Sequence, residues 1–376
     1  MATHQFITLE SFLGFFTAQK PQTISEYITN ARVKIRDRLV PLVQYIDEHA
    51  NRDIVPLFNH IVNREQYLTR FYNTSLCVVD ILPEPQLATI LNNNSQPLMK
   101  NRIRNLFLKE ILCDTKSGFE NIPTYLDVLF NLYQYPDSII DYKLITPSAI
   151  QYAKNGRIGS VFSSFYFRAS IMNPALVYNI RAHFFPNAKT IMTPTMGWTS
   201  YLNGFSYGPT KLDHYVGIDV IDSVCVKSHT HTPLTFGTGP CKINIYKCPS
   251  ELITTRIPEF ITQYTNYFDA IFFSPPYYRM ELYDSPDQST TNYKTYGNWL
   301  SQYWEETVKL CKTCINPDGG IFSYVVSPFD NHDLPTDLKV ITEKYFRLLH
   351  VVPIYNKNVN STKHRKPNDS LYVFVA

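Results

Sequence analysis

The sequence lacks an apolar run of about 18 residues and a secretory leader pattern, so no transmembrane helix is expected. Its 7 cysteines are an odd number, which argues against a framework of paired disulfides and favours a reducing, intracellular (cytoplasmic) compartment. A large excess of positive or negative charge is also lacking, because 35 Lys and Arg residues nearly balance 32 Asp and Glu residues and the net charge is only +3 at pH 7. That value is too small to indicate nucleic-acid binding by itself.

Repeats and low-complexity tracts are absent too, and charged residues make up only 18% of the chain. These absences exclude a disordered, collagenous or coiled-coil protein. What is present is a length of 376 residues, of which 44% are hydrophobic, with 27 Tyr and 24 Phe. Such a chain can fold as one large α/β domain or as two domains. Its many aromatic rings can pack a core or stack on a planar ligand.

The first part of the chain reads as helical. Thr23-Ile-Ser-Glu26 has the spacing of a capping box, and apolar residues recur behind it at helical intervals until Pro41. Further helices are expected at Arg102–Leu112 and Leu126–Tyr133. We therefore predict a helical domain over residues 1–150, which holds DNA or a partner protein, including a second copy of the chain.

From about residue 170 the pattern changes to short β-rich runs that alternate with helical stretches. Strands are expected at Thr190–Thr193, His214–Ile218, Lys242–Tyr246, Ala270–Phe273, Ile321–Val326 and Leu371–Val375. Helices are expected at Asn173–Phe184, Ser200–Ser206, Glu251–Tyr264, Tyr293–Cys314 and Leu334–Phe346. This alternation predicts an α/β domain over residues 151–376, with a mostly parallel sheet covered by helices.

The sharpest motif is Ser274-Pro275-Pro276-Tyr277, which follows the apolar stretch Asp269–Phe273. It places a hydroxyl, a carbonyl and an aromatic ring at the carboxyl end of a strand, where α/β sheets bind their ligands. The two prolines remove two N–H donors and leave a site that accepts hydrogen bonds. Such a site suits a substrate that donates, for example an exocyclic amino group. In isolation, Pro-Pro-Tyr is also compatible with a turn or a partner-binding segment.

Ser274–Tyr277 and the residues after it resemble the S-adenosylmethionine-dependent DNA amino-methyltransferases, whose hallmark is Asp/Asn/Ser-Pro-Pro-Tyr/Phe/Trp. Tyr283, Gln288-Ser289, Tyr293 and Trp299 are similar to a phage- and virus-type branch of that family. Over roughly residues 160–376 the resemblance implies a Rossmann-like methyltransferase fold and methylation of N4 of cytosine or N6 of adenine. Serine in the first position favours cytosine. Ser274 and the Pro275 carbonyl would accept from the amino group of a flipped base, which stacks on Tyr277.

The resemblance extends to a cofactor loop. Thr193-Pro-Thr195-Met-Gly197 is similar to the family's Asp-Pro-x-x-Gly-x-Gly, in which glycine lets the backbone approach the methionine moiety. Two residues depart from the pattern: Thr193 stands where the family usually has Asp or Asn, and Thr199 replaces the second glycine. The loop therefore lacks a carboxylate that could bind the cofactor's ammonium group. Asp219 ends the His214–Ile218 strand, where α/β nucleotide folds place an acid on ribose hydroxyls, so we expect it to bind the ribose of S-adenosylmethionine. The resemblance implies further cofactor contacts by Cys248, Phe165 and Tyr166, for which ordinary packing is the alternative.

For DNA contacts, the basic side chains expected near the cleft are Arg279, Lys363, Arg365 and Lys366. No metal is expected, because Cys311-x-x-Cys314 ends a helix without a second such pair and His229-Thr-His231 falls in an expected loop over residues 225–241. Two other functions stay open. One is methylation of RNA or of a protein glutamine, and the other is a catalytically silent relative that binds nucleic acid or partner proteins.

Overall fold

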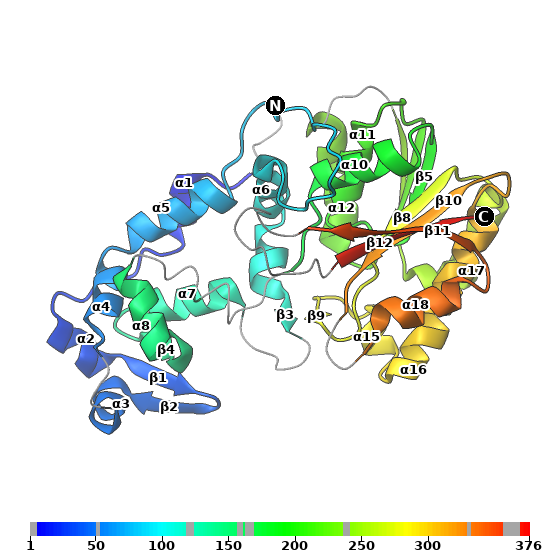
Figure 1. The fold of residues 1–376 in the computed structure, drawn as a ribbon. Helices are drawn as coiled ribbons and strands as arrows, with labels where there is room; N and C mark the ends of the chain where they lie inside the picture. Colours follow the sequence, from blue (N-terminus) through cyan, green and yellow to red (C-terminus); the bar gives the residue numbers. More distant parts are fainter. Residues whose placement is uncertain are drawn as a thin grey trace. The chain divides into compact units, whose positions relative to one another are not determined.

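The computed structural model describes residues 6–49, 53–117, 124–155, 161, 169–235, 241–328, 332–355 and 369–376. Backbone contacts divide the chain into two compact units (Figure 1). The first comprises Met1–Val78 with Arg104–Ala169, and the second comprises Val79–Ile103 with Ser170–Ala376. Each unit is described below by itself.

The first unit combines helices with a small sheet. In the sheet, β1 (Arg32–Ile35) pairs antiparallel with β2 (Arg38–Pro41) and parallel with β4 (Ile139–Asp141). The helical and other short elements are α1 (Leu9–Gly14), α2 (Ile24–Asn30), α3 (Leu42–Glu48), α4 (Val55–Val62), α5 (Arg64–Ser75), the π-helical η1 (Glu110–Asp114), β3 (Lys116–Ser117), α7 (Tyr125–Tyr133), the 3-10 turn η2 (Tyr142–Ile145) and α8 (Pro147–Lys154). Helix α6 (Pro97–Leu106) begins in the second unit's residues and ends in those of the first.

The prediction of one long helix from Thr23 to Pro41 is wrong. Thr23 does cap a helix, since its side chain accepts from the Glu26 N–H at 3.1 Å, but that helix ends at Asn30. The hairpin β1–β2 follows, and it turns at Arg36, whose φ is 54°. Val33 and Val40 pair across the hairpin and are both buried, so alternating burial overrides the helical spacing.

The second unit is built on a sheet whose described strands have the order β11-β12-β10-β8-β5-β6-β7. The strands β5, β6, β7, β8 and β10 run parallel, whereas β12 is antiparallel to both β10 and β11. Their bounds are β5 (Thr190–Thr193), β6 (His214–Asp219), β7 (Lys242–Lys247), β8 (Ala270–Phe273), β10 (Ile321–Val326), β11 (Arg347–Ile354) and β12 (Asp369–Val375). The six strands that the sequence predicts are therefore confirmed, and β11 is an addition.

Helices lie on both sides of this sheet (Figure 1). They and the remaining short elements are α10 (Pro174–Phe184), α11 (Ser200–Ser206), α12 (Asp222–Thr235), η3 (Ser250–Leu252), α13 (Ile253–Arg256), α14 (Glu259–Tyr264), β9 (Glu281–Leu282), α15 (Ser289–Asn292), α16 (Tyr296–Asn298), η4 (Trp299–Trp304), α17 (Glu305–Cys314) and α18 (Leu334–Thr342). The core between the layers is aromatic, with Phe272, Phe273, Trp304 and Phe322 fully buried.

Two predictions about these connections need correction. Residues 225–241 were expected to form a loop, but α12 runs to Thr235 and packs against β6 and β7. Val224 is fully buried on that helix, so packing outweighs the weak local preference of a Thr- and His-rich segment. The helix expected over Glu251–Tyr264 is broken at Ile257-Pro258, as a proline inside a helical pattern dictates.

The two units do not divide at residue 150. The second begins at Ser170 and also takes in 79–103, which the sequence pattern had grouped with the N-terminal helices. Hydrogen bonds explain why this segment belongs to the sheet unit. Asn179 on α10 accepts from the Ala88 N–H at 2.6 Å, and the Asn93 N–H donates to the Tyr355 carbonyl at 2.7 Å.

Candidate active site

The residues singled out by the sequence follow the carboxyl ends of neighbouring parallel strands. The loop with Gly197 follows β5, Asp219 ends β6, Cys248 follows β7 and Ser274 follows β8. Ser327, which the sequence does not single out, follows β10. The chain leaves β5 for β6 and β7 on one side and for β8 and β10 on the other. The edge between β5 and β8 is therefore the switch point at which sheets of this kind bind ligands.

The loop between β5 and α11 has an unusual backbone. Gly197, Trp198 and Thr199 have φ angles of 52°, 59° and 64°, so three consecutive residues are left-handed. Outside glycine this conformation costs energy, and it is typical of functional sites where surrounding packing holds it. Trp198 and Thr199 are indeed buried. Thr199, the departure from the glycine of the family pattern, is thus accommodated in the turn by packing.

Gly197 is required by its surroundings as well as by its φ angle. A Cβ atom there would overlap the ring of Tyr201. We expect Gly197→Ala to lower the free energy of unfolding by roughly 1–3 kcal/mol and to displace the loop. Thermal denaturation checks this, with Gly297→Ala as the matched control, since a Cβ at that exposed glycine meets nothing within 4 Å. An equal melting temperature for both variants would contradict the requirement.

Asp219 fixes this loop to the next strand. Its Oδ2 accepts from the Met196 N–H and its Oδ1 from the Ile221 N–H, each at 3.0 Å. Burial raises the pKa of Asp219, although these backbone donors act in the opposite direction. Each carboxylate oxygen keeps a further lone pair, so hydroxyl groups can still be accepted beside the loop. The position fits the ribose role predicted for Asp219, which stays a prediction.

The two threonines of the loop differ in what they can reach. Thr193 is fully buried, and its hydroxyl bonds the Tyr215 hydroxyl at 2.6 Å, so it is directed into the sheet. Thr195 is half-buried, and its hydroxyl donates to the Ser274 carbonyl at 3.0 Å. The structure therefore places Thr195 at the site and Thr193 behind it.

Ser274 makes hydrogen bonds to Tyr201, Thr195 and Val325, and its side chain also interacts with the Tyr277 hydroxyl. Its N–H donates to the Tyr201 hydroxyl at 3.1 Å, its carbonyl accepts from Thr195, and its Oγ donates to the Val325 carbonyl at 2.9 Å. Because Val325 takes the hydroxyl proton, the Oγ has only lone pairs left to offer a further partner. Ser274 is thus a fixed acceptor beside the loop that contains Gly197.

The rest of the tetrapeptide is rigid. Pro275 is buried, whereas Pro276 and Tyr277 are half-buried. The Tyr277 hydroxyl accepts from the Ser327 N–H at 2.8 Å and from the Ser327 hydroxyl at 3.2 Å, which fixes the ring. The carboxylate of Asp369, the first residue of β12, also interacts with the Ser327 side chain. The aromatic ring is thereby anchored at its far end to two further strand ends.

Tyr277 offers a test of stacking. If a planar substrate packs on its ring, Tyr277→Phe should keep most of the substrate affinity. Tyr277→Ala should raise KM about tenfold to a hundredfold. Cofactor affinity should be unchanged in both variants, because the ring is bound to Ser327 and not to the loop. Steady-state kinetics with separate cofactor titrations distinguish the cases. Equal KM values for the two variants would rule stacking out.

Two buried side chains, Glu251 of η3 and Tyr303 of η4, have a polar atom without a partner among the described residues. Glu251 is 8% exposed and its Oε1 has no hydrogen-bond partner, and the same holds for the hydroxyl of Tyr303, which is 2% exposed. Burial raises the pKa of Glu251 to about 7. Cys248 is buried beside them, and its N–H donates to the Asp219 carbonyl at 3.0 Å. Buried polar atoms without partners are costly, so these two atoms indicate a place for a polar ligand.

Of the remaining predicted site residues, the structure describes Arg279 alone. Arg279 is exposed two residues after Tyr277, with a φ of 54°. Phe165, Tyr166, Lys363, Arg365 and Lys366 lie outside the described residues.

The Cys-x-x-Cys pair is part of the core. Cys311 and Cys314 are fully buried on α17, and burial raises the pKa of both thiols. Within the described ranges, His, Cys, Asp and Glu form no group that could hold a metal ion. In the same part of the chain no helix combines the length and apolarity needed to cross a membrane.

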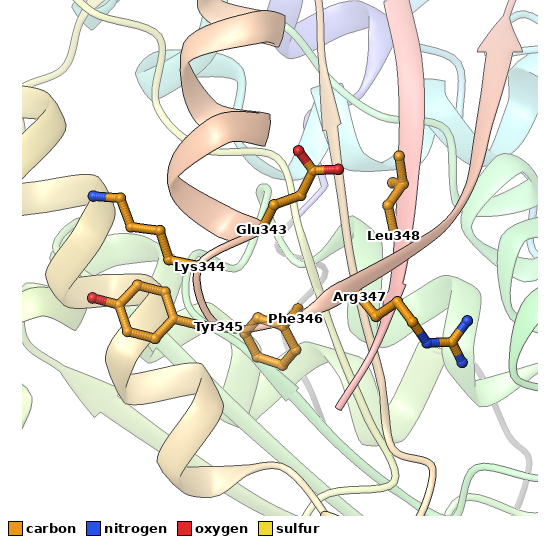
Figure 2. Close-up of a pocket in the computed structure, with 6 residues that line it drawn as sticks. All are labelled: Glu343, Lys344, Tyr345, Phe346, Arg347 and Leu348. Carbon is orange, nitrogen blue, oxygen red and sulfur yellow. The ribbon is translucent and has the colours of Figure 1, made fainter.

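A surface hollow lies elsewhere on this unit. It is lined by Glu343–Leu348, between the end of α18 and the start of β11 (Figure 2). Arg347 pairs with Val375, which in turn pairs with Ile321 at the start of β10. The hollow is therefore at the amino ends of the parallel strands, opposite the candidate site, and we assign it no role.

Comparisons with known proteins give likenesses of fold. No protein-family model matches the chain, and no curated protein matches its sequence. Among solved structures, a proposed S-adenosylmethionine-dependent methyltransferase from Streptococcus mutans is 10% identical with a TM-score of 0.40, over 56% of this chain and 50% of that one. TrmN from Thermus thermophilus is 13% identical with a TM-score of 0.36, over 54% of this chain and 48% of that one.

A third solved structure is similar to a comparable extent. An S-adenosylmethionine-dependent methyltransferase from Aquifex aeolicus is 13% identical with a TM-score of 0.31, over 54% of this chain and 98% of that one. This chain covers about half the length of the first two structures. The strand order, with five parallel strands and the antiparallel β12 between β10 and β11, is that of an open, mostly parallel α/β sheet of the Rossmann-like class. The fold class predicted from the sequence is confirmed.

Proposed function

We propose that the second unit transfers a methyl group from S-adenosylmethionine to the exocyclic amino group of a flipped DNA base, N4 of cytosine or N6 of adenine. The observation that carries the proposal is the state of Ser274. Its hydroxyl proton is taken by Val325, and its backbone is bonded on both sides to residues of the Gly197 loop and α11. A fixed acceptor for an amino group thus lies next to a loop suited to a nucleoside cofactor.

The residues present fit that cofactor. Gly197 allows close backbone approach, Asp219 can accept from ribose hydroxyls, and the buried Oε1 of Glu251 can accept from the amino group of an adenine ring. When bound, S-adenosylmethionine supplies a sulfonium methyl that becomes bonded to nitrogen as its bond to sulfur breaks, with the electron pair staying on sulfur. The protein's part is to bind, to orient and to exclude water.

Ser274 and the Pro275 carbonyl would orient the nitrogen. An amino group that donates to both acceptors is drawn from planar toward tetrahedral geometry, so its lone pair is directed at the methyl group. The nitrogen loses one proton to solvent as the new bond forms. Because the acceptors are fixed before the reaction, little reorganisation is needed in the transition state.

DNA as the substrate rests on the resemblance of the Ser274–Tyr277 motif and on the exposed Arg279 beside it. A duplex hides the amino nitrogen, so the base has to leave the stack. Tyr277, with its hydroxyl held by Ser327, offers a rigid ring face for the extruded base. We further propose that the first unit contributes contacts to DNA or to a partner, including a second copy of the chain.

A second candidate is a catalytically silent relative, favoured by one observation. Thr193 stands where the family has an acid, and it is buried against Tyr215. A chain that had lost the cofactor's carboxylate partner would keep the fold and bind nucleic acid without transferring methyl groups. The two candidates differ in whether S-adenosylmethionine binds at all.

The test uses the full chain, S-adenosylmethionine with a labelled methyl group, and either mixed-sequence duplex DNA or total RNA. Nucleoside mass spectrometry then identifies the product, and calorimetry measures cofactor binding. N4-methylcytosine or N6-methyladenine in DNA is the expected result. Label only in RNA would move the substrate to RNA, and cofactor binding with label in neither polymer would favour a protein substrate. Absence of cofactor binding would establish the silent relative.

A further inference from the structure

The Gly197 loop itself offers no carboxylate to a cationic ligand. Thr193 occupies the position of the family's acid, and its hydroxyl is used by Tyr215. Asp219, the acid at the next strand end, accepts hydrogen bonds from the N–H groups of Met196 and Ile221. It also lies where a ribose is expected. A bound S-adenosylmethionine would therefore need another acid for the ammonium group of its methionine moiety.

Glu281 is such an acid, and the sequence pattern does not single it out. It begins β9, four residues after Tyr277, and is only 8% exposed. Its Oε1 accepts from the Ser170 N–H at 3.1 Å, and its Oε2 accepts from the Tyr283 hydroxyl. The Ser170 side chain also interacts with this carboxylate, and all of these donors are neutral. Among the residues that the structure describes, no Lys, Arg or His forms an ion pair with Glu281.

Its position relative to the loop follows from its neighbours. The ring of Tyr283 meets Trp198 edge to face, with the centroids 5.8 Å apart, and Trp198 is the residue after Gly197. Tyr201, whose ring lies against Gly197, is within electrostatic reach of both Glu281 and Asp219. The two carboxylates thus lie around the same glycine loop, with the Tyr201 hydroxyl between that loop and Ser274.

A buried carboxylate without a cation is expensive, because burial removes water and neutral donors replace it only in part. Burial accordingly raises the pKa of Glu281. A second, independent sign of a ligand is the hydroxyl of Tyr303, which is 98% buried and has no hydrogen-bond partner within the described part of the chain. It lies within electrostatic reach of Asp219, Glu251 and Tyr201. Tyr201 and Asp219 thus connect the unpartnered hydroxyl of Tyr303 with the glycine loop that Glu281 adjoins.

We propose that Glu281 binds the ammonium group of the cofactor's methionine moiety, in place of the acid that Thr193 replaces. The assignment rests on the proposed function and gives it a cation site that the loop alone lacks. A charge-assisted hydrogen bond to Glu281 removes the cost of an isolated buried acid. The threonine at position 193 then indicates that the acid is supplied by another segment, and not that cofactor binding is lost.

Two nucleosides test this with the full chain. S-adenosylmethionine carries the ammonium group, and 5′-methylthioadenosine lacks the whole amino-acid part. We expect Glu281→Gln to weaken S-adenosylmethionine binding about tenfold to a hundredfold, as loss of a hydrogen bond to a charged group does. Binding of 5′-methylthioadenosine should be unchanged. The matched control is Asp284→Asn, an exposed acid three residues along the same segment, which should change neither affinity.

Each other outcome overturns a named statement. Equal affinity of Glu281→Gln and wild type for S-adenosylmethionine would remove Glu281 from the site, and an equal loss for both nucleosides would reduce it to a structural role. If the wild type binds 5′-methylthioadenosine alone, the ammonium site is wrong while a nucleoside site stands. If it binds neither, the proposed function fails and this assignment with it. Should Glu281→Gln not fold, Glu281→Asp keeps the charge and should keep the preference for S-adenosylmethionine.

Discussion

Replacement of Ser274 by alanine should cut methyl transfer by about a hundredfold to a thousandfold while leaving cofactor affinity within about threefold of wild type. The Oγ of Ser274 gives its proton to the Val325 carbonyl, so its lone pairs remain for the substrate's amino group. Alanine removes that acceptor and leaves the backbone bonds to Tyr201 and Thr195 in place. The loss should therefore appear in the rate of the chemical step.

Single-turnover transfer of a labelled methyl group and a cofactor titration measure the two quantities separately. Loss of the bond to Val325 should also cost about 1 kcal/mol of stability, so transfer is measured well below the melting temperature. Ser323→Ala is a suitable control, because Ser323 is a buried serine of β10 whose hydroxyl has no partner among the described residues. Unchanged transfer by Ser274→Ala would remove this hydroxyl from the mechanism.

Replacement of Asp219 by alanine should have the opposite signature, with cofactor affinity reduced about a hundredfold or more, since hydrogen bonds to a charged group are worth about 1.5–3 kcal/mol each. The Met196 and Ile221 N–H groups lose their acceptor together, and any ribose hydroxyl loses it too. Asp219→Asn keeps one acceptor oxygen without the charge, and we expect an intermediate affinity. Calorimetric titration of S-adenosylmethionine checks the order of the three proteins.

Acidification should reproduce part of this effect in the wild type. Burial raises the pKa of Asp219, so its carboxylate is protonated at a higher pH than an exposed aspartate would be. Cofactor affinity should fall as the pH is lowered through that value, because a protonated carboxyl group is a weaker acceptor. In Asp219→Asn the amide does not titrate, so this contribution to the pH dependence of cofactor affinity should be absent. If Asp219→Ala binds the cofactor as tightly as wild type, the ribose is held elsewhere.

Much of the sheet could be predicted from the sequence, for a physical reason. Strands such as Ala270–Phe273 are buried on both faces and read as continuous apolar runs. Since parallel strands end at a common edge, Gly197, Asp219 and Ser274 could be placed together before their geometry was known. That inference needed only strand direction and order along the chain.

What the sequence could not supply is contact between elements that are distant along the chain. Tyr201 bonds Ser274, and Glu281 comes near the Gly197 loop through Tyr283 and Trp198, only once β5 and β8 are paired. Neither side chain stands in a motif, and a lone Glu after Tyr277 reads as an exposed loop acid. The hairpin at 32–41 is a different case, because the alternation of Val33 and Ile35 around polar residues was a strand signal that the capping box obscured.

The backbone of Ser274 is bonded to Thr195 through its carbonyl and to Tyr201 through its N–H. A ligand that orders the Gly197 loop therefore also orders the acceptor of the amino group. Such coupling is reciprocal: the factor by which cofactor strengthens substrate binding must equal the factor by which substrate strengthens cofactor binding. We expect cooperative formation of the ternary complex, with the substrate slowing the release of unreacted cofactor.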